Sequence, residues 1–341
     1  MPDSGRWVVV GLDNGGTTNN TTVLDAAGRF LVDKLAEGPS CVRDGPERAI
    51  EALADSLAQV LALTGTDRSQ VRAVGLDTPG PVIADGVISS KGATNFLHPA
   101  WRGFDVRGAL EARLGIPVLY SNDANAAALY AHYVHFGPEL APQRSSVSVI
   151  VGTGLGGGVI ERGHVVHGAA GMAGELGHIW IPMEGLLAEG QPVPECNCGL
   201  AGDAESIASL TGIGKNLLPF WLTRYPDHEL GRPGLASSAA KLVRGHGEAG
   251  DPLALAIFGQ QAIAVGRLFT IAANFTDPDV YFLGGGVVEA APHFREWFLD
   301  RVREHTLLRK EQAGAASIAL VPDRDMAGAR GSAIAARNAV R

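Results

Sequence analysis

Cysteine, charge and aromatic side chains are all scarce in this chain of 341 residues. Three cysteines argue against a disulfide framework and favour a reducing compartment. Charged residues make up only 19%, and Lys+Arg 28 against Asp+Glu 36 gives a net charge of −8. Without a basic excess, the composition argues against a nucleic-acid-binding protein.

Long apolar runs are also missing. No stretch of about 18 apolar residues occurs, so the sequence predicts no membrane span. The first residues, MPDSGRWVVVGLD, lack the basic start and long apolar core of a signal peptide. We therefore expect a cytoplasmic protein.

Hydrophobic residues and glycine are abundant instead. The hydrophobic fraction of 46% is ample for a sizeable core, and the length favours two domains over one large α/β domain. The 45 glycines are clustered, which is typical of sharp turns at sites rather than of a low-complexity segment.

Strand and helix patterns alternate along the chain. Trp7–Leu12 and Thr21–Asp25 predict strands on either side of a Gly-Gly turn, and Phe30–Leu35 predicts a third strand. Apolar residues at helical spacing predict an amphipathic helix over Pro46–Leu63. A second strand–glycine–strand cycle begins at residue 147, so the two halves repeat one architecture.

The first motif with chemical potential is Asp13-Asn14-Gly15-Gly16-Thr17-Thr18, between two predicted strands. Glycines there let backbone N–H groups approach phosphate oxygens, and an aspartate at a strand end can hold Mg²⁺. A simple hairpin turn with a capping aspartate is the alternative. The motif is no Walker A loop, because the Gly-Lys-Ser/Thr ending is missing.

Two further glycine clusters follow strands. The run from Gly152 to Gly158 has six glycines or threonines in seven positions and suits a backbone cradle for an anion. It leads into a predicted strand rather than a helix, which argues against a dinucleotide fingerprint. Leu283-Gly284-Gly285-Gly286 is either a tight turn or a place where backbone approaches a nucleotide.

Ser121-Asn122-Asp123-Ala124-Asn125 stands where a strand enters a helix. Helix capping alone would explain asparagine and aspartate at this position. As a site, Asn122 would bond a polar substrate, and Asp123 would accept a proton from a hydroxyl group.

A histidine and a cysteine pair predict a metal site. Gly174-Glu175-Leu176-Gly177-His178 precedes Cys196-Asn197-Cys198-Gly199, and such a knuckle is typical of zinc. A loop with two free thiols is the alternative. Glu175, His178 and Glu205 would lie beside the metal, where polar groups can bind sugar hydroxyls.

In combination and in order, these motifs resemble the ROK family of repressors, open reading frames and sugar kinases. The resemblance covers nearly the whole chain, and it is carried by Asp13-x-Gly-Gly-Thr17, Thr78-Pro-Gly-Pro81, Asn122-Asp123-Ala-Asn125, Gly152-Thr-Gly-x-Gly-Gly-Gly158, Glu175-x-Gly-His178, Cys196-x-Cys198-Gly and Leu283-Gly-Gly-Gly286.

The resemblance implies an α/β protein with an actin-like, hexokinase-like ATPase fold and two α/β domains flanking a cleft. We expect a small domain over residues 1–123, with a C-terminal helix at about 326–341 packing back on it, and a large domain over 124–325. It also implies transfer of the γ-phosphate of ATP, with Mg²⁺, to a hexose. Glucose is the first expectation, and N-acetylmannosamine, fructose, mannose and allose are alternatives.

The resemblance also implies roles for individual residues. Asp123 matches the catalytic base. The remaining matches are the sugar contacts Asn95, Asn122, Asp123, Glu175, His178 and Glu205, and the ATP and Mg²⁺ residues Asp13, Gly15, Gly16, Thr17, Thr153, Gly154, Gly284 and Gly285. His178, Cys196 and Cys198 match zinc ligands.

The sequence departs from the family pattern at two places. Asp203 stands where the family has its last cysteine, so we expect a zinc site of His178, Cys196, Cys198 and Asp203 that is weaker than usual. Residues 184–194 lengthen the loop before it, and Thr18 stands where lysine is common.

Partners are expected to be small molecules and a second copy of the chain. The resemblance implies a homodimer or homotetramer, and no nucleic acid or membrane is expected. Polyphosphate is an alternative phosphate donor. A non-catalytic sugar-binding regulator is the rival function, although the first phosphate loop begins at Asp13, too early for a preceding helix-turn-helix.

Overall fold

The computed structural model describes residues 7–78, 82–83, 86–89, 96–232 and 238–341. Its contacts divide the chain into two compact units. Unit 1 comprises residues 1–144, 159–174 and 321–341, and unit 2 comprises residues 145–158 and 175–320. The predicted domain boundary at residue 123 stays a prediction.

The first sheet lies in unit 1 and has the strand order β3-β2-β1-β4-β7. Its strands are β1 (Val8–Asn14), β2 (Thr18–Asp25), β3 (Ala36–Pro39), β4 (Val71–Thr78) and β7 (Val118–Asn122). β1, β4 and β7 run parallel, so their carboxyl ends meet at one edge of the sheet. This edge carries the polar ends of all three strands.

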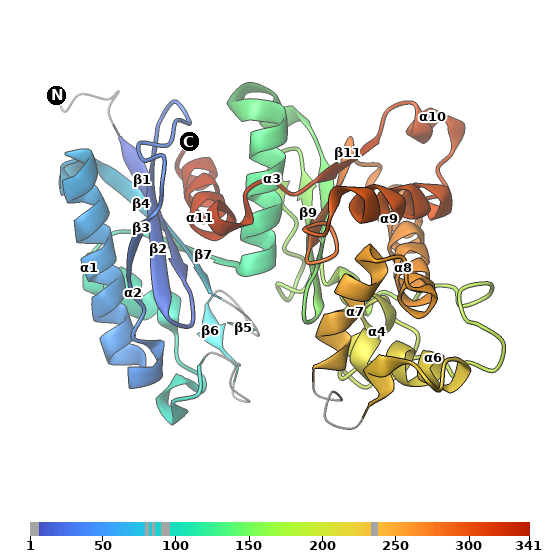
Figure 1. Cartoon of the computed structure of the whole chain (residues 1–341). Helices are drawn as coiled ribbons and strands as arrows, with labels where there is room; N and C mark the ends of the chain where they lie inside the picture. Colours follow the sequence, from blue (N-terminus) through green and yellow to red (C-terminus); the bar gives the residue numbers. More distant parts are fainter. Residues whose placement is uncertain (1–6, 79–81, 84–85, 90–95, 233–237) are drawn as a thin grey trace. The chain divides into compact units, whose positions relative to one another are not determined.

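Both faces of the first sheet are buried, which explains why β1 is a continuous apolar run. Val8, Val10 and Leu12 pack in the core beneath α1 (Pro46–Thr64) and α2 (Val106–Leu114). Val9 faces the other core, which α3 (Asp123–Leu140) and α11 (Arg324–Val340) share. Figure 1 shows α1 and α11 on opposite faces of this sheet.

Glycines allow α11 to approach the sheet closely. A Cβ atom on Gly11 of β1 would overlap the backbone of Ala329, and one on Gly75 of β4 would overlap the backbone of Ser332. Any larger residue at these two positions would push the helix away from the strands. The last helix, α11, therefore packs directly onto strands β1 and β4 from the first part of the sequence.

The second sheet has the order β10-β9-β8-β11-β12. Its strands are β8 (Ser146–Val151), β9 (Leu155–Glu161), β10 (His164–Val165), β11 (Val280–Gly285) and β12 (Ser317–Leu320). β8, β11 and β12 are parallel, and β9 returns antiparallel to complete the glycine-rich hairpin. A small third sheet pairs β5 (Val82–Ile83) with β6 (Val87–Ile88).

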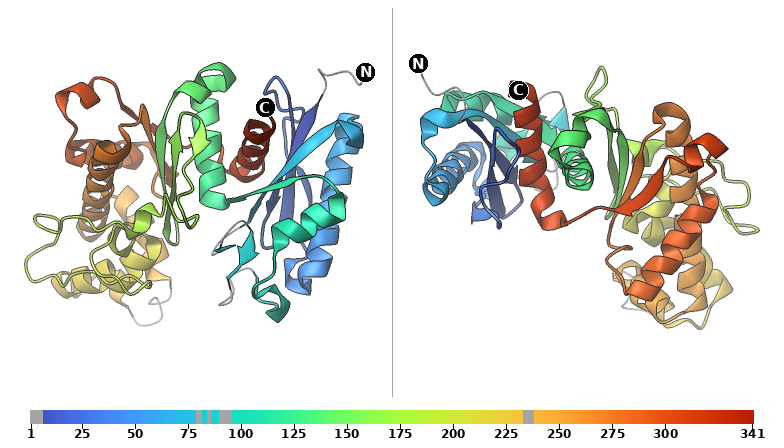
Figure 2. Two further views of the ribbon diagram at one scale, coloured as in Figure 1. Left: turned by 180° about the vertical axis from the view of Figure 1, so that it is seen from behind. Right: turned by 90° about the horizontal axis from the view of Figure 1, so that it is seen from above.

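Unit 2 is rich in helices, which the two views of Figure 2 show from other sides. The long helix α8 is apolar enough by length and composition to cross a membrane, but 61% of its most apolar window is buried within the protein. It is therefore packed as a core helix. The helices of this unit are α4 (Glu205–Ala208), α5 (Leu210–Gly212), α6 (Leu218–Arg224), α7 (Ala239–Glu248), α8 (Pro252–Thr276), α9 (Pro292–His305) and α10 (Lys310–Ala313).

Two expectations about local structure were wrong. Phe30 makes a single bridge to Leu24, and the third strand begins only at Ala36, where the chain has returned to β2. Gly156, Gly157 and Gly158 belong to strand β9, so only Gly152 to Gly154 form the turn. In both cases pairing with a neighbouring strand decided the local conformation.

Candidate active site

Asp13 lies at the polar edge of the first sheet, near the carboxyl end of β1. Its Oδ2 accepts a hydrogen bond from Asn20 Nδ2 at 2.9 Å. Burial raises the pKa of Asp13, the hydrogen bond from Asn20 lowers it, and the negative charge of Asp123 raises it. Two predicted site residues, Asp13 and Asp123, thus interact within unit 1.

Asp77 is a third carboxylate in this cluster, and the sequence analysis did not identify it. It stands directly beside Asp13 on the neighbouring strand β4 and is only 1% exposed. Ser332 Oγ of α11 donates to its Oδ1 at 2.8 Å, whereas its Oδ2 is buried without a hydrogen-bond partner among the described residues. Burial, together with the charge of Asp13, raises the pKa of Asp77 well above its ordinary value.

Gly328 of α11 shows how close these carboxylates are. A Cβ atom at Gly328 would lie 2.9 Å from both Asp13 Cγ and Asp77 Oδ2. The two atoms are therefore no more than twice that distance apart. The sequence offered a signal for Asp77, because this aspartate lies at the end of the buried parallel strand β4.

Asp123 is the first residue of α3, and Asn122 is its N-cap. Asn122 Oδ1 accepts from Asn125 N at 2.7 Å, so the capping interpretation is confirmed. Asp123 Oδ1 accepts from Ala124 N at 2.8 Å. The side chain is open to solvent, yet the protein around it reduces its hydration and raises the pKa of Asp123, while the hydrogen bond from Ala124 lowers it.

Gly15, Gly16 and Thr17 form the turn between β1 and β2. Gly15 N donates to Thr18 O at 3.0 Å, which closes the turn. Thr17 is exposed, and its carbonyl accepts from Ser40 N at 3.0 Å. The hydroxyl groups of Thr17 and Thr18 lie 3.5 Å apart, within hydrogen-bond distance of each other.

The turn over Gly152–Gly154, between β8 and β9, is held by hydrogen bonds within unit 2. Gly152 N donates to Gly154 O at 2.9 Å, and Thr211 Oγ1 donates to Thr153 O at 2.8 Å. A Cβ atom on Gly154 would lie 2.7 Å from Glu205 Oε2. That oxygen accepts from Leu155 N at 2.8 Å, so the glutamate fixes the end of the turn.

Gly284 and Gly285 end strand β11 rather than following it. Gly285 has φ 107°, and a Cβ atom there would overlap the backbone of Val151 on β8. Only glycine fits this position, because the left-handed conformation and the close neighbour both exclude a side chain.

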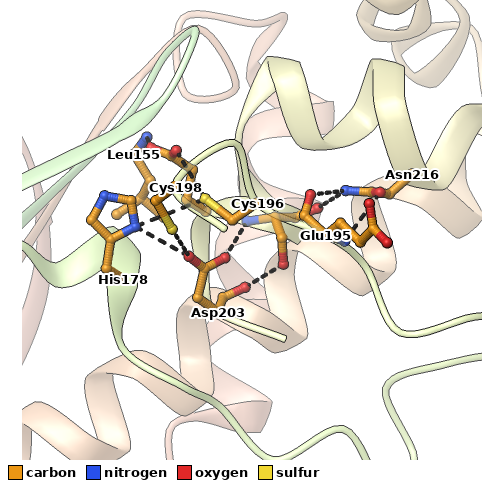
Figure 3. Close-up of polar contacts among 9 residues, drawn as sticks. Leu155, His178, Glu195, Cys196, Cys198, Asp203 and Asn216 are labelled. Atoms are coloured by element: carbon orange, nitrogen blue, oxygen red, sulfur yellow. Dashed lines mark hydrogen bonds and ion pairs between the residues drawn. The ribbon is translucent and has the colours of Figure 1, made fainter. Parts of the chain in front are cut away.

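Four predicted metal ligands converge in unit 2, as Figure 3 shows. Asp203 is fully buried, and its Oδ2 lies 3.1 Å from His178 Nδ1 and 3.6 Å from Cys198 Sγ. Cys196 Sγ lies 3.9 Å from His178 Nδ1. Ser206 N donates to Asp203 Oδ1 at 2.9 Å, which orients the carboxylate toward the cluster.

These separations fit a tetrahedral zinc ion. Zinc–ligand bonds of about 2.0–2.3 Å place neighbouring donor atoms about 3.3–3.8 Å apart. The donor atoms of the four side chains all lie within 4.8 Å of one another. Burial raises the pKa of the Cys196 thiol. Burial also acts to raise the pKa of the Asp203 carboxyl group, but hydrogen bonds from His178 and Ser206 outweigh it, and the pKa of Asp203 is lowered.

Two predicted sugar contacts border this cluster. Glu205 begins α4, and its Oε1 accepts from Cys196 Sγ at 3.5 Å. Glu175 is the N-cap of the short helical turn Leu176–His178. Asn95 was also predicted to contact the sugar, and it lies outside the described residues.

Comparison with known proteins decides the family. The ROK family profile matches residues 9–339. This chain belongs to the ROK family. It is 33% identical over 317 residues to a glucokinase of Halalkalibacterium halodurans, covering 88% of this chain and 89% of the relative. It is also 33% identical over 275 residues to an N-acetyl-D-glucosamine kinase of Erwinia tasmaniensis, covering 76% and 82%.

Solved structures agree on the fold. The ROK hexokinase of Thermus thermophilus matches with a TM-score of 0.76 and 33% identity, covering 98% of this chain and 99% of that one. A ROK glucokinase of Streptomyces griseus, solved with glucose and AMPPNP, matches with a TM-score of 0.64 and 28% identity, covering 97% and 99%. The ROK chain described here has the actin-like, hexokinase-like ATPase fold.

Proposed function

We propose that this ROK sugar kinase transfers the γ-phosphate of ATP to a hydroxyl group of glucose, forming glucose 6-phosphate, with Asp123 as the general base. The observation that carries the proposal is the Asp123 carboxylate at the start of α3. It is open to solvent, and one oxygen is held by Ala124 N while the other is left to accept a proton. A ligand bound there would meet both this base and the polar group of Asn122.

ATP and Mg²⁺ are proposed as the donor pair. Phosphoryl transfer needs in-line positioning and stabilisation of negative charge more than covalent help. The two glycine turns offer backbone N–H groups and threonine hydroxyls to the phosphates, and Gly284 and Gly285 offer a surface without side chains to the adenosine. Asp13 supplies a carboxylate oxygen of the kind that Mg²⁺ prefers. The glucokinase solved with AMPPNP supports ATP over polyphosphate.

The sugar would be held by amide, carboxylate and imidazole groups. Asn122 uses its Oδ1 for capping, which leaves its NH₂ group to donate to a hydroxyl. Glu175 and His178 flank the metal cluster, and Glu205 has lone pairs beyond its bonds to Leu155 and Cys196. Asn95 completes the proposed set.

Zinc is proposed as a structural ion held by His178, Cys196, Cys198 and Asp203. Bound zinc would cross-link the loop over residues 184–203 to the segment that carries His178. With Nδ1 facing the cluster, the imidazole is oriented so that Nε2 is left for the sugar. A carboxylate in place of the third thiolate makes the site weaker.

N-acetyl-D-glucosamine is the second candidate acceptor, because the chain is as identical to a kinase for that sugar as to a glucokinase. We also propose a homodimer or homotetramer. Light scattering near 35 kDa at micromolar concentration would contradict that assembly.

The test is a panel of hexoses assayed with ATP and with polyphosphate, with coupled detection of ADP in the ATP series. Glucose, N-acetylglucosamine, N-acetylmannosamine, fructose, mannose and allose form the panel. We expect the highest kcat/KM for glucose with ATP. No turnover with any sugar would contradict the kinase, whereas a higher value for another hexose would contradict only the choice of glucose.

A further inference from the structure

Unit 1 contains a cavity of about 210 Å³. It lies between α3, α11 and the turn that follows β9, and Figure 1 shows α3 and α11 side by side. Leu129 and Ile334 form part of its apolar wall. Three arginines and a histidine are among its other lining residues: Arg162, His164, Arg337 and Arg341. Among the residues that the structure describes, no aspartate or glutamate side chain lines the cavity.

Arg337 is a buried cation without an acidic partner among the described residues. The residue is only 2% exposed, and its Nε and Nη2 both donate to the carbonyl of Ala26, at 3.3 and 3.1 Å. The nearby Asp25 carboxylate is bound to Arg29 at 2.8 Å instead. Burial removes water from the guanidinium group and lowers the pKa of Arg337. A buried charge of this kind is normally paired, so an anion would stabilise it.

Arg162 is held at the cavity by an unfavourable turn. It has φ 46° and Gly163 has φ 77°, and together they join β9 and β10 in a two-residue hairpin. Such turns prefer asparagine or aspartate at the first position, because an arginine is strained there. Asn338 Nδ2 of α11 donates to Gly163 O at 3.1 Å, which fixes the turn against the helix.

The charge balance favours an anion. Glu161 lies 3.9 Å from Arg162, and both side chains are largely exposed, so water screens this ion pair. The carboxyl end of α11 contributes about half a negative charge, which is less than the two positive charges of Arg337 and Arg341 at the cavity. This positive site stands out in a chain of net charge −8.

We propose that this cavity binds a small phosphate-bearing anion, with its phosphate on Arg162, Arg337 and Arg341 and any carbon body against Leu129 and Ile334. Guanidinium groups bind phosphate oxygens through charge-assisted hydrogen bonds, which Arg337 would form through Nη1 because its Nε and Nη2 donate to Ala26 O. The volume lies below the range of about 300–1,000 Å³ typical of pockets for drug-sized ligands, so the ligand is small. The site is separate from the residues proposed for phosphoryl transfer and does not depend on that function.

The test is isothermal titration calorimetry of the full chain at constant ionic strength. Inorganic phosphate and glucose 6-phosphate are the probes, and glucose, which should bind only at the proposed active site and equally in every variant, is the uncharged control. The test variant is Arg162→Asn combined with Arg341→Gln, because asparagine suits the turn and residue 341 is exposed, so folding is retained. The control variant is Arg113→Gln, which removes an exposed arginine of unit 1 that pairs with Glu51.

We expect the cavity to bind the anion equally well in the wild type and in Arg113→Gln and more weakly in the double variant, whereas glucose 6-phosphate bound at the proposed active site should bind all three proteins alike. Each arginine removed from the cavity should raise the dissociation constant about tenfold, as expected for a charge-assisted hydrogen bond. Inorganic phosphate alone binding in this way would identify a free phosphate site, and tighter glucose 6-phosphate binding would identify an organic phosphate. No binding to the wild type, or equal affinity in the double variant and Arg113→Gln, would overturn the proposal.

Discussion

Replacing Asp123 by asparagine separates the proposed base from every other role of that residue. Asparagine keeps the shape and retains an Oδ1 that can accept from Ala124 N, the hydrogen bond measured at 2.8 Å. The start of α3 should therefore form as before. What is lost is the second carboxylate oxygen as a proton acceptor.

The expected loss in kcat is about 10²–10⁴-fold, the scale of general base catalysis. At about 1.36 kcal/mol for each factor of ten, the variant loses about 2.7–5.4 kcal/mol of transition-state stabilisation. Sugar affinity should change little, because the amide still offers hydrogen bonds. Steady-state kinetics with coupled ADP detection measure the first quantity, and calorimetry with the sugar measures the second.

The pH profile provides an independent test of the same assignment. The pKa of Asp123 is raised, so its carboxylate is lost through protonation at a higher pH than for an ordinary aspartate. Wild-type kcat/KM should therefore fall as pH falls through that raised pKa, and this acid limb should be absent from the residual activity of Asp123→Asn.

Asp105→Asn is the matched control. Asp105 is the N-cap of α2, and its Oδ1 accepts from Gly108 N at 2.7 Å, so it is also an aspartate that binds a helix start. Its replacement should leave kcat within about twofold of the wild type, because Asp105 has no proposed catalytic role. Near-wild-type turnover of Asp123→Asn, or an equal loss in both variants, would refute the role of Asp123 as the base.

Three further predictions concern the glycine turn, the metal and the buried carboxylate. Gly154→Val places a side chain 2.7 Å from Glu205 Oε2, which is also a proposed sugar contact, so the KM for ATP should rise about tenfold or more and by a larger factor than the dissociation constant of the sugar. Gly259→Val, where a Cβ atom meets nothing within 4 Å, should raise neither, and equal KM values for ATP would contradict the phosphate cradle. Protein purified without chelator should contain zinc by elemental analysis, and Asp203→Ala should lose it; less than about 0.2 zinc per chain with full activity would show that the metal is dispensable. The pKa of Asp77 is raised in the folded protein, so the folded state binds a proton more tightly than the unfolded state does. The free energy of unfolding should therefore decrease as pH rises from about 3.9, the unfolded pKa, through the folded pKa. The decrease amounts to about 1.4 kcal/mol for each pH unit between the two pKa values. Asp77→Asn should lack this decrease in urea titrations across pH, and an unchanged slope would show that Asp77 ionises freely.

Local patterns in the sequence determined most of the individual elements. The predicted helix over Pro46–Leu63 is α1, because its apolar spacing and its initial proline suffice without distant contacts. The glycine turns after β1 and β8 were also predictable, since both are short and self-contained. Asn122 was predictable as a cap, because capping involves only the next three residues.

Spacing in the sequence also indicated the metal cluster. Cys196 and Cys198 are separated by one residue, and Asp203 follows in the family's cysteine position. Tertiary structure was needed to show that Asp203 turns its Oδ2 toward His178, because Ser206 N holds the other oxygen. The sequence supplied the ligand types, and the backbone of α4 supplied their orientation.

Only the tertiary structure decided the features built from distant segments. Asp77 becomes a site residue because β4 pairs with β1 in register and α11 seals the pair, and no local pattern encodes that register. The third strand moved from residues 30–35 to Ala36–Pro39 because pairing with β2 outweighed local preference. Arg337 and Arg162 are 175 positions apart, and they line one cavity only because α11, which follows unit 2 in the sequence, packs against the hairpin of β9 and β10. A pattern read along the chain is short-ranged, whereas burial and charge depend on which segments the fold places together.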